Sequence, residues 1–236
     1  MNYFAVVPAT FISRPNRFIA HVCLDTSKNN EIEIVHVKNT GRCKELLIPG
    51  AKVYLEKSQN PSRKTQYDLI AVEKKFPENL QKKLLVNMDS QLPNKVALEW
   101  LNSQNYSFIK PEFTFGKSRI DFYMEKEDKK FLMEVKGCTL EIDGIGYFPD
   151  APTERGVKHL EELILSRQQG FECKIAFVIQ MEGITEVRGN RKTHPEFAQA
   201  LEKAEKAGVE VLFLCCHVEP DKVQIDKVIK KDDYVE

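Results

Sequence analysis

Two acidic residues and a lysine on neighbouring predicted strands have the types and spacing that could do chemistry. Glu134 and Lys136 are two positions apart in an extended segment, so their side chains point to the same face of the strand. Asp121 lies in the preceding extended segment, and a polar turn at residues 127–130 predicts that the two strands form a hairpin. The pattern therefore predicts that two carboxylates and one ammonium group meet at one place.

This set of side chains suits the hydrolysis of a phosphodiester. Mg²⁺ prefers oxygen ligands and is commonly held by one or two carboxylates, with water and phosphate in the other positions. We therefore expect Asp121 and Glu134 to hold Mg²⁺, with Mn²⁺ as the alternative metal. Lys136 would orient the attacking water or offset the charge that develops on the phosphate. The structural alternative is an ordinary solvated strand face, where acidic residues and lysines often alternate.

Further residues are expected to complete this site. Glu99, on a predicted helix before the strands, is the expected fourth catalytic residue. Gln180, at the end of a later strand, and Asp150, in a loop rich in glycine and proline, are expected to line the pocket, although Asp150 could instead structure its loop. Nucleic-acid contacts are expected from the first turns of the next helix, where backbone N–H groups attract phosphate: Arg155, Lys158 and His159. An ordinary helix-surface histidine is the alternative for His159.

The elements that position these residues predict an α/β domain at residues 87–236, with a mixed sheet flanked by helices. Thr153 is the expected N-cap of the second helix, and Gly208 ends the third. The predicted order is helix 93–101, strands 113–115, 119–125 and 131–135, helix 153–165, strand 173–180, helix 195–207 and strand 209–216.

Residues 1–86 have a different pattern, which predicts a small OB-like β-barrel. Strands are expected at residues 17–24, 31–37, 52–56 and 65–72, and the first two are expected to form a hairpin through a turn at 25–30. This part holds 14 lysines and arginines against 8 aspartates and glutamates, a net charge of +6, so the remainder of the neutral chain carries −6. We therefore expect an α+β protein of two domains, a basic β-barrel followed by an acidic α/β domain.

The basic residues of the predicted barrel lie in its loops, where they could follow a phosphate backbone. Tyr67 or Tyr54 could stack on a base, and Arg42 follows a turn at residues 39–41. The expected nucleic-acid-binding residues of this domain are Arg14, Arg17, Arg42, Arg63, Lys64 and Tyr67. The structural alternative is a set of solvated loop charges.

The C-terminal pattern resembles the PD-(D/E)xK nuclease superfamily. In that superfamily a helical glutamate, a strand aspartate and an acidic-x-lysine triplet follow in the order of Glu99, Asp121 and Glu134 with Lys136 here. One departure is that Ile120, rather than proline, precedes Asp121. The resemblance implies a metal-dependent nuclease core.

Longer motifs resemble the sugar fermentation stimulation protein A family over nearly the whole chain. They are 14–18 (RPNRF), 36–42 (HVKNTGR), 63–69 (RKTQYDL), 118–122 (SRIDF), 134–137 (EVKG), 148–156 (FPDAPTERG), 158–160 (KHL) and 177–180 (FVIQ). The resemblance implies a prokaryotic cytosolic protein with an N-terminal OB-like domain and a C-terminal nuclease-like domain. It also implies DNA binding with weak sequence preference and a link to the regulation of sugar metabolism.

Composition excludes several other classes of protein. A hydrophobic content of 42% with 30% charged residues is typical of a folded soluble domain rather than a disordered chain. No apolar run is long enough to span a bilayer, and no signal peptide is recognisable, so we expect a cytoplasmic protein without a membrane partner. The six cysteines lack zinc-site spacing and are expected in the core.

Three functions compete on these observations. The first is a Mg²⁺-dependent nuclease acting on DNA or RNA, and the second is a non-catalytic DNA-binding regulator of sugar metabolism built on a nuclease scaffold. The third and weakest is an enzyme that modifies RNA or a small molecule with the same carboxylates. Nuclease-like proteins often form homodimers, and no residue pattern here decides that state.

Overall fold

The structure, a computed structural model, describes residues 1–27, 31–39, 41–76, 78–116 and 118–233. Contacts divide the chain into two compact units. The N-terminal unit comprises Met1–Leu92, Gln180–Glu182 and His217–Gln224, and the C-terminal unit comprises Pro93–Ile179, Gly183–Cys216 and Ile225–Glu236. The main division thus falls a few residues after the predicted boundary at residue 86, and two short segments from the second half of the chain belong to the N-terminal unit.

The N-terminal unit contains a closed five-stranded barrel with one added strand, which confirms the predicted OB-like fold. Its strands are β1 (Val6–Asn16), β2 (Ile19–Leu24), β3 (Ile32–Val37), β4 (Lys52–Lys57), β5 (Tyr67–Phe76) and β6 (Asn79–Asn87). Hydrogen-bonded neighbours follow the order β3-β2-β1-β4-β5-β6, and an additional β3–β5 pairing closes the barrel. This closing pair is parallel and joins His36 to Asp68 and Val37 to Leu69.

Side-chain alternation and a local turn explain how the barrel strands form. In β3, Val35 and Val37 are buried in the core, whereas Ile34 between them is exposed. The Asn16 side chain accepts hydrogen bonds from the N–H groups of Phe18 and Ile19 at 2.9 and 3.1 Å. This turn makes β2 begin two residues later than predicted. The antiparallel β2–β3 pair is confirmed, but residues 28–30 of its predicted turn, and Thr40 of the next, lie outside the described residues.

The C-terminal unit contains a mixed sheet flanked by helices, as predicted. Its helices are α1 (Leu92–Leu101), α2 (Glu154–Gln168) and α3 (Pro195–Lys206), and a short 3-10 helix follows at Lys231–Asp233. The main sheet has the order β15-β14-β12-β9-β8-β7. Its strands are β7 (Phe108–Phe115), β8 (Ser118–Lys126), β9 (Lys129–Cys138), β12 (Glu172–Ile179), β14 (Glu210–Val218) and β15 (Val223–Lys230). β9, β12 and β14 are parallel, whereas β7, β8 and β9 form antiparallel neighbours.

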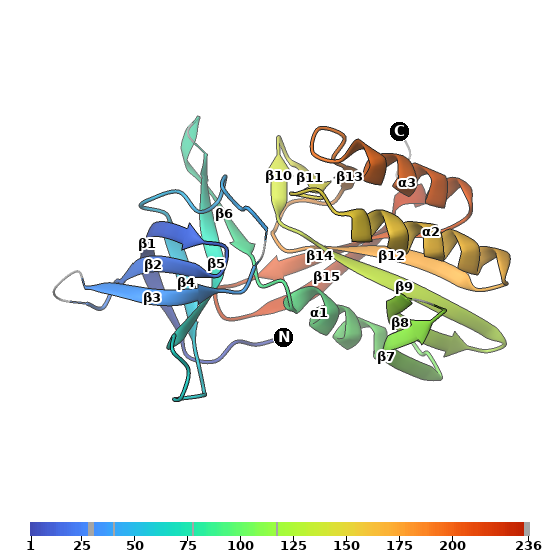
Figure 1. The fold of residues 1–236 in the computed structure, drawn as a ribbon, viewed down its shortest axis with the longest axis horizontal. Helices are drawn as coiled ribbons and strands as arrows, with labels where there is room; N and C mark the ends of the chain where they lie inside the picture. Colours follow the sequence, from blue (N-terminus) through green and yellow to red (C-terminus); the bar gives the residue numbers. More distant parts are fainter. Residues whose placement is uncertain (28–30, 40, 77, 117, 234–236) are drawn as a thin grey trace. The chain divides into compact units, whose positions relative to one another are not determined.

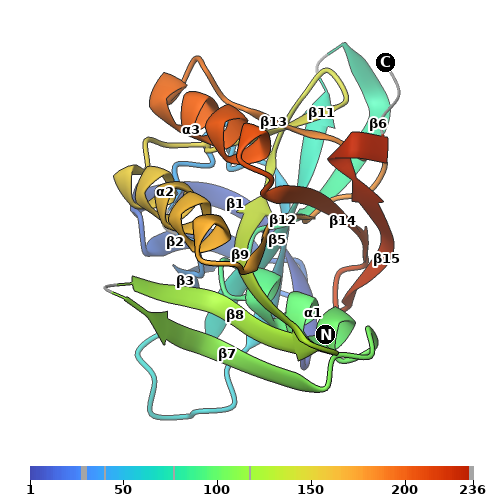
Figure 2. The same cartoon turned by 90° about the vertical axis from the view of Figure 1, so that its right-hand side faces the viewer.

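Local chemistry fixes the ends of the two long helices. The Thr153 hydroxyl accepts the Gly156 N–H at 3.1 Å, which confirms the predicted N-cap of α2. Pro195 begins α3, and Gly208 follows its end with a φ of +84°. Figures 1 and 2 show α2 and α3 side by side over one face of the sheet, with α1 on the other side. Among the described residues, no helix is long and apolar enough to cross a membrane.

The segment 143–152, predicted as a loop, instead contributes a strand. β10 (Leu140–Ile142), β11 (Ile145–Phe148) and β13 (Val187–Gly189) form a separate three-stranded sheet. A Cβ atom at Gly146 would lie 3.0 Å from both the Cys138 Sγ and the Glu186 carbonyl oxygen. The glycine that suggested a loop is therefore a site of close packing between strands.

Candidate functional site

Asp121 lies where two paired strands separate. The β8–β9 pairing ends at Phe122 and Met133, so β8 residues before Phe122 pair only with β7. The Asp121 Oδ2 atom accepts the Val135 N–H at 2.8 Å, and its Oδ1 atom accepts the Asn94 side-chain N–H at 2.9 Å. Asn94 belongs to α1, so that helix and β9 together fix the orientation of the carboxylate.

Glu134 is the most constrained carboxylate of this region. Its side chain is buried, with 2% of the residue exposed. The Oε1 atom accepts hydrogen bonds from the Lys136 ammonium group at 2.6 Å and from the His159 Nδ1. The Oε2 atom is also buried, but it has no hydrogen-bond partner among the described residues. A buried carboxylate oxygen without a partner is costly, so this atom is a natural ligand for a cation.

His159 lies between Glu134 and an arginine. The Arg155 Nε–H group donates to the His159 Nε2 at 3.2 Å. Because Nε2 accepts this bond, the imidazole proton lies on Nδ1 and is donated to Glu134. The histidine therefore helps to hold the glutamate in one orientation, in which Oε1 accepts both donors and Oε2 accepts none from the described residues.

The two carboxylates differ in their electrostatics. Burial, followed by the nearby Glu134 charge, raises the pKa of Asp121 above its ordinary value. Burial also acts to raise the pKa of Glu134, but the hydrogen bonds from His159 and Lys136 and the Lys136 charge outweigh it and lower that pKa. Glu134 is thus stabilised as an anion beside a second carboxylate that lacks full compensation. Such a pair favours a bound cation.

The donor set fits a hard divalent cation bound by few protein ligands. Asp121 and Glu134 offer carboxylate oxygens, which Mg²⁺ and Mn²⁺ accept. In the part of the chain that the structure describes, no group of three or more histidines, cysteines or carboxylates could enclose a metal ion. Water and phosphate would therefore fill the remaining positions, as is common for Mg²⁺.

The other predicted members of the site, Glu99, Gln180 and Asp150, have different surroundings. Glu99 is exposed on α1, and five helical residues place it about 140° around the axis from Asn94. Gln180 belongs to the N-terminal unit, where its buried amide donates to the Asn87 carbonyl at 3.0 Å and the Asp89 carbonyl at 3.2 Å. Asp150 is half-buried before the N-terminus of α2. The structure therefore joins Asp121, Glu134 and Lys136, whereas the roles of Glu99 and Asp150 stay predictions and Gln180 binds residues of the N-terminal unit.

Two participants were not assigned to the acidic site from the sequence. Asn94 carries no distinctive signal, because only the orientation of α1 against the sheet brings it to Asp121. His159, predicted to contact nucleic acid, is instead 5% exposed and bonded to Glu134. It lies on the buried stripe of α2 together with Gly156, Leu160 and Leu163, a spacing that the sequence already contained.

Two of the predicted nucleic-acid-binding arginines, Arg14 and Arg63, form hydrogen bonds within the N-terminal unit. Arg63 pairs with both carboxylate oxygens of Asp68, at 2.7 and 2.8 Å. The Arg14 guanidinium donates to four backbone carbonyls at 2.7–2.9 Å: those of Arg17, Asn39, Gly41 and Arg42. The side chains that remain exposed are Arg17, Arg42 and Lys64 here, and Arg155 and Lys158 on α2, while Tyr67 is half-buried.

We expect Arg14→Ala to lower the unfolding free energy by about 1–3 kcal/mol, because several carbonyls lose their donor together. Urea denaturation measures this loss, and Arg17→Ala is the matched control, because Arg17 is exposed and its guanidinium only lies over the Phe18 ring at 5.8 Å. If Arg14→Ala instead weakened DNA binding without changing stability, the assignment of Arg14 as a structural residue would be wrong.

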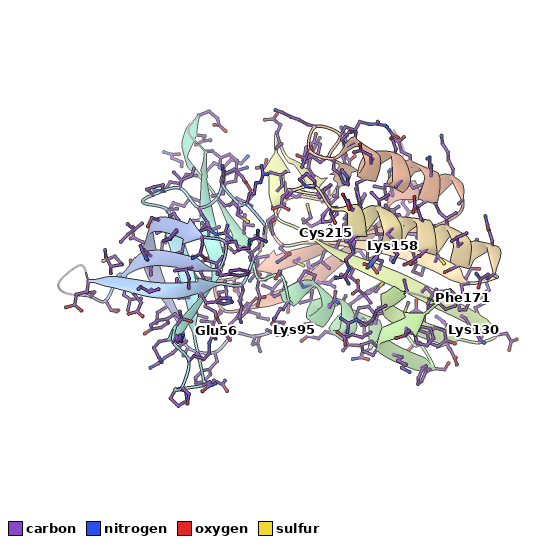
Figure 3. All side chains as sticks on the ribbon, viewed as in Figure 1. Glu56, Lys95, Lys130, Lys158, Phe171 and Cys215 are labelled. Atoms are coloured by element: carbon purple, nitrogen blue, oxygen red, sulfur yellow. The ribbon has the colours of Figure 1, made fainter. Side chains whose placement is uncertain are left out.

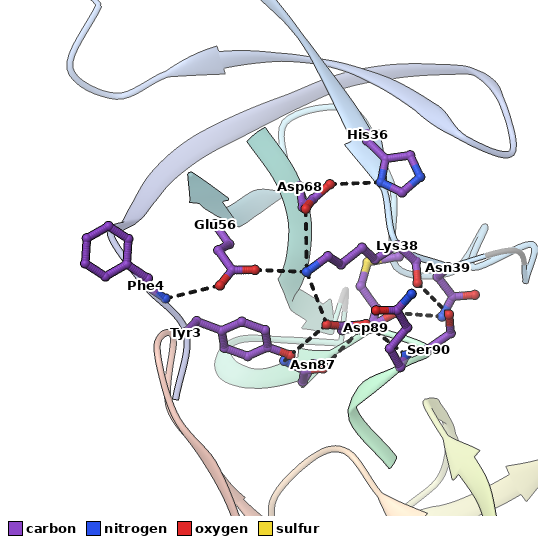
Figure 4. Close-up of polar contacts among 12 residues, drawn as sticks. Tyr3, Phe4, His36, Lys38, Asn39, Glu56, Asp68, Asn87, Asp89 and Ser90 are labelled. Atoms are coloured by element: carbon purple, nitrogen blue, oxygen red, sulfur yellow. Dashed lines mark hydrogen bonds and ion pairs between the residues drawn. The ribbon is translucent and has the colours of Figure 1, made fainter. Parts of the chain in front are cut away.

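A second charged cluster lies in the N-terminal unit, around Lys38 (Figure 4). The Lys38 ammonium group lies 2.9 Å from Glu56, 3.5 Å from Asp68 and 3.6 Å from Asp89. His36 also contacts Asp68, at 2.9 Å. Since His36 and Asp68 are a closing pair of the barrel, this cluster lies at its β3–β5 seam.

Comparison with known proteins gives consistent matches over the chain. Residues 12–81 match the family described as SfsA N-terminal OB domain, and residues 91–222 match the Sugar fermentation stimulation protein RE domain. A sugar fermentation stimulation protein homolog of Ruminiclostridium cellulolyticum is 47% identical over 98% of this chain and 99% of the relative. A homolog from Desulfitobacterium hafniense strain Y51 is 49% identical over 95% of each chain.

A solved structure supports the same architecture. The structure of Pyrococcus furiosus SfsA in complex with Ca²⁺ matches with a TM-score of 0.79 and 27% sequence identity. The match covers 98% of this chain and 95% of that protein. Both units therefore have a counterpart of known structure.

Proposed function

The chain belongs to the sugar fermentation stimulation protein family, and from this premise we propose that it binds nucleic acid and hydrolyses phosphodiester bonds with a divalent metal ion. The observation that carries the proposal is the state of Glu134, whose Oε1 atom is occupied by Lys136 and His159 while its buried Oε2 atom has no partner. An anion held in this way beside Asp121 is suited to a cation.

Each residue of the cluster has a separate task in this proposal. Asp121 and Glu134 would hold Mg²⁺ or Mn²⁺, and His159 would keep the Glu134 carboxylate in its binding orientation. When bound, the metal would polarise the scissile phosphate and make a bound water more acidic. The Lys136 side chain is 14% exposed, so its ammonium group is accessible enough to contact a phosphate oxygen or the attacking water.

A related structure that contains Ca²⁺ supports a divalent cation. Ca²⁺ and Mg²⁺ share a preference for oxygen ligands, although Ca²⁺ accepts more of them and a more flexible geometry. A Ca²⁺ complex of the relative is thus consistent with carboxylate ligands in this chain, and we propose Mg²⁺ or Mn²⁺ as the ion for catalysis.

Exposed basic residues support a polyanionic substrate. Arg17, Arg42 and Lys64 are exposed in the N-terminal unit, whose barrel sequence carries a charge of +6. In the C-terminal unit, Lys158 is 59% exposed on α2 and lies 3.9 Å from Glu162. Residues of this kind bind phosphates without reading sequence, so weak sequence preference is expected.

The test is a cleavage assay with labelled single-stranded and duplex DNA and RNA, in Mg²⁺, Mn²⁺ or EDTA. We expect metal-dependent cleavage by the wild-type protein and a loss of about 10²–10³-fold in Lys136→Met, as for removal of one charge-stabilising group. Lys130→Met is the matched control, because Lys130 lies on the same strand but is exposed, and four residues of extended strand, about 13 Å, separate it from Glu134.

The outcomes separate the nuclease from the runner-up function. Cleavage that is unaffected by EDTA, or equal in both lysine variants, would contradict the assigned site. Binding without any cleavage would favour a non-catalytic DNA-binding regulator, in which the nuclease scaffold only holds the phosphate backbone. The basic N-terminal barrel is the observation that keeps this second function in consideration.

A further inference from the structure

Five aromatic side chains form a continuous row on the C-terminal sheet, which we call the aromatic row. It comprises Phe108, Phe113, Phe115, Tyr123 and Phe171. The Phe113 and Tyr123 rings are stacked with their centres 4.6 Å apart, and Phe108 meets Tyr123 edge to face at 6.1 Å. At the other end, Phe115 lies 6.5 Å from Phe113 and 5.0 Å from Phe171.

The row is only partly covered by the rest of the unit. β7 is an edge strand of the sheet, and Phe108 at its start is 47% exposed. Phe113, Phe115 and Phe171 are half-buried, and Figure 3 marks Phe171 beyond the end of α2. Tyr123 is buried beneath its neighbours. Partly exposed aromatic rings in a continuous row are unusual on a surface that has no partner.

The sheet places this row beside Glu134. Tyr123 pairs with Leu132 across the β8–β9 hairpin, and Leu132 is two residues before Glu134 on β9. Side chains two apart on a strand share a face and are separated by roughly 7 Å. Glu134 contacts His159 on α2, and Phe115 contacts Phe171 just after α2. Tyr123 is therefore the member of the aromatic row nearest the acidic site, and the row continues along the same side of the sheet towards the end of α2.

Cationic side chains accompany the row. The Lys110 ammonium group lies 5.5 Å from the centre of the Phe113 ring. Arg119 is 60% exposed and lies 3.6 Å from Glu112. Glu112 lies within β7 next to Phe113 and has a φ of +52°, a conformation that a residue with a side chain rarely adopts. The backbone of this edge strand therefore has an unusual conformation directly before Phe113, whose ring stacks on Tyr123.

We propose that the aromatic row is a stacking platform for unpaired bases, so that the site beside it acts on single-stranded nucleic acid. This proposal rests on the proposed function for its reaction, but the platform itself concerns binding. Bases in a duplex are already stacked on each other, whereas every unpaired base offers a face to an aromatic ring, whatever its sequence. Lys110 and Arg119 would contact the phosphates between such bases.

The test is a binding measurement on the full chain in EDTA, where metal-dependent cleavage is absent. The probes are a fluorescent DNA strand of about 12 nucleotides, the same strand without bases, and the corresponding duplex. We expect the wild-type protein to prefer the intact single strand. Phe108→Ala should weaken that binding about tenfold, because loss of one stacked base costs roughly 1–3 kcal/mol. Binding of the baseless strand and of the duplex should not change.

Two further variants keep the test independent of folding. Phe108→Tyr retains the ring and should bind like the wild type, and Phe4→Ala removes an exposed phenylalanine of the N-terminal unit, 60% exposed, as the control. Equal effects of Phe108→Ala on intact and baseless strands, or a wild-type preference for duplex, would overturn the platform. If the wild-type protein cleaves, but Phe108→Ala binds the intact single strand as well as the wild type does, only the platform is refuted. If Phe108→Ala loses binding of the intact strand, but the wild-type protein does not cleave, only the nuclease is refuted.

Discussion

Replacing Lys38 with methionine is expected to lower the unfolding free energy by about 3–5 kcal/mol, because buried carboxylates would lose their counter-charge. The Lys38 ammonium group lies within 3.6 Å of Glu56, Asp68 and Asp89. The Asp68 side chain is 6% exposed and that of Asp89 is fully buried. Methionine keeps most of the lysine stem, so the loss would report charge more than packing. Urea denaturation at neutral pH measures it.

The control for this variant is Lys64→Met, which removes an exposed charge from the same unit. Its effect should stay within about 0.5 kcal/mol, as for most surface substitutions. Equal urea midpoints for the two variants would show that solvent, rather than Lys38, compensates the three carboxylates.

The pH dependence of stability should change in the same variant. Burial alone would raise the pKa of Asp68, but Arg63, His36 and Lys38 outweigh it and lower that pKa in the folded state. Asp68 therefore contributes stability above its unfolded pKa of about 4, and this contribution is lost as the pH falls through the lower folded value. Without Lys38 the folded pKa should move back towards the unfolded one. Stability should then depend less on pH below about 4 than in the wild type.

The sequence predicted the strand pair of the acidic site because its signals are local. Glu134 and Lys136 obey the two-residue period of a strand, and the polar turn at 127–130 joins that strand to the one with Asp121. The caps of α2 and α3 were equally local and were confirmed. Periodicity, turns and caps each involve residues within a few positions of one another, so a single sequence contains them.

The contacts that the sequence could not predict join residues far apart in the chain. Arg14 contacts carbonyls up to 28 residues away, and Lys38 contacts Asp89 across the barrel. A basic residue that binds its own chain has the same sequence signal as one that binds phosphate, so Arg14 and Arg63 were assigned to nucleic acid. The sequence also did not determine which residue of α1 would reach Asp121. The prediction named Glu99 for the site, and the structure shows a hydrogen bond from Asn94 to Asp121.

The final expectation is that Glu134→Gln removes cation binding and strongly lowers cleavage while it preserves the fold. Glutamine has the same shape as glutamate, and its carbonyl oxygen can still accept the donors from Lys136 and His159. The change removes the negative charge and replaces one oxygen with a donor group, which a cation cannot use. Cleavage should fall on the order of 10²–10³-fold, as measured in the nuclease assay.

Cation binding gives a readout that does not depend on activity. A ligand that binds only the folded state stabilises it by about 2.7 kcal/mol when its free concentration is 100 times its dissociation constant. Mg²⁺ or Ca²⁺ should therefore raise the midpoint of thermal unfolding of the wild type. The midpoint of Glu134→Gln should be the same with cation and with EDTA. Glu161→Gln, an exposed site on α2, is the control and should respond like the wild type. If Glu134→Gln were still stabilised by the cation, the unpaired Oε2 atom would not be the ligand, and Glu134 would serve the fold through His159 and Lys136 instead.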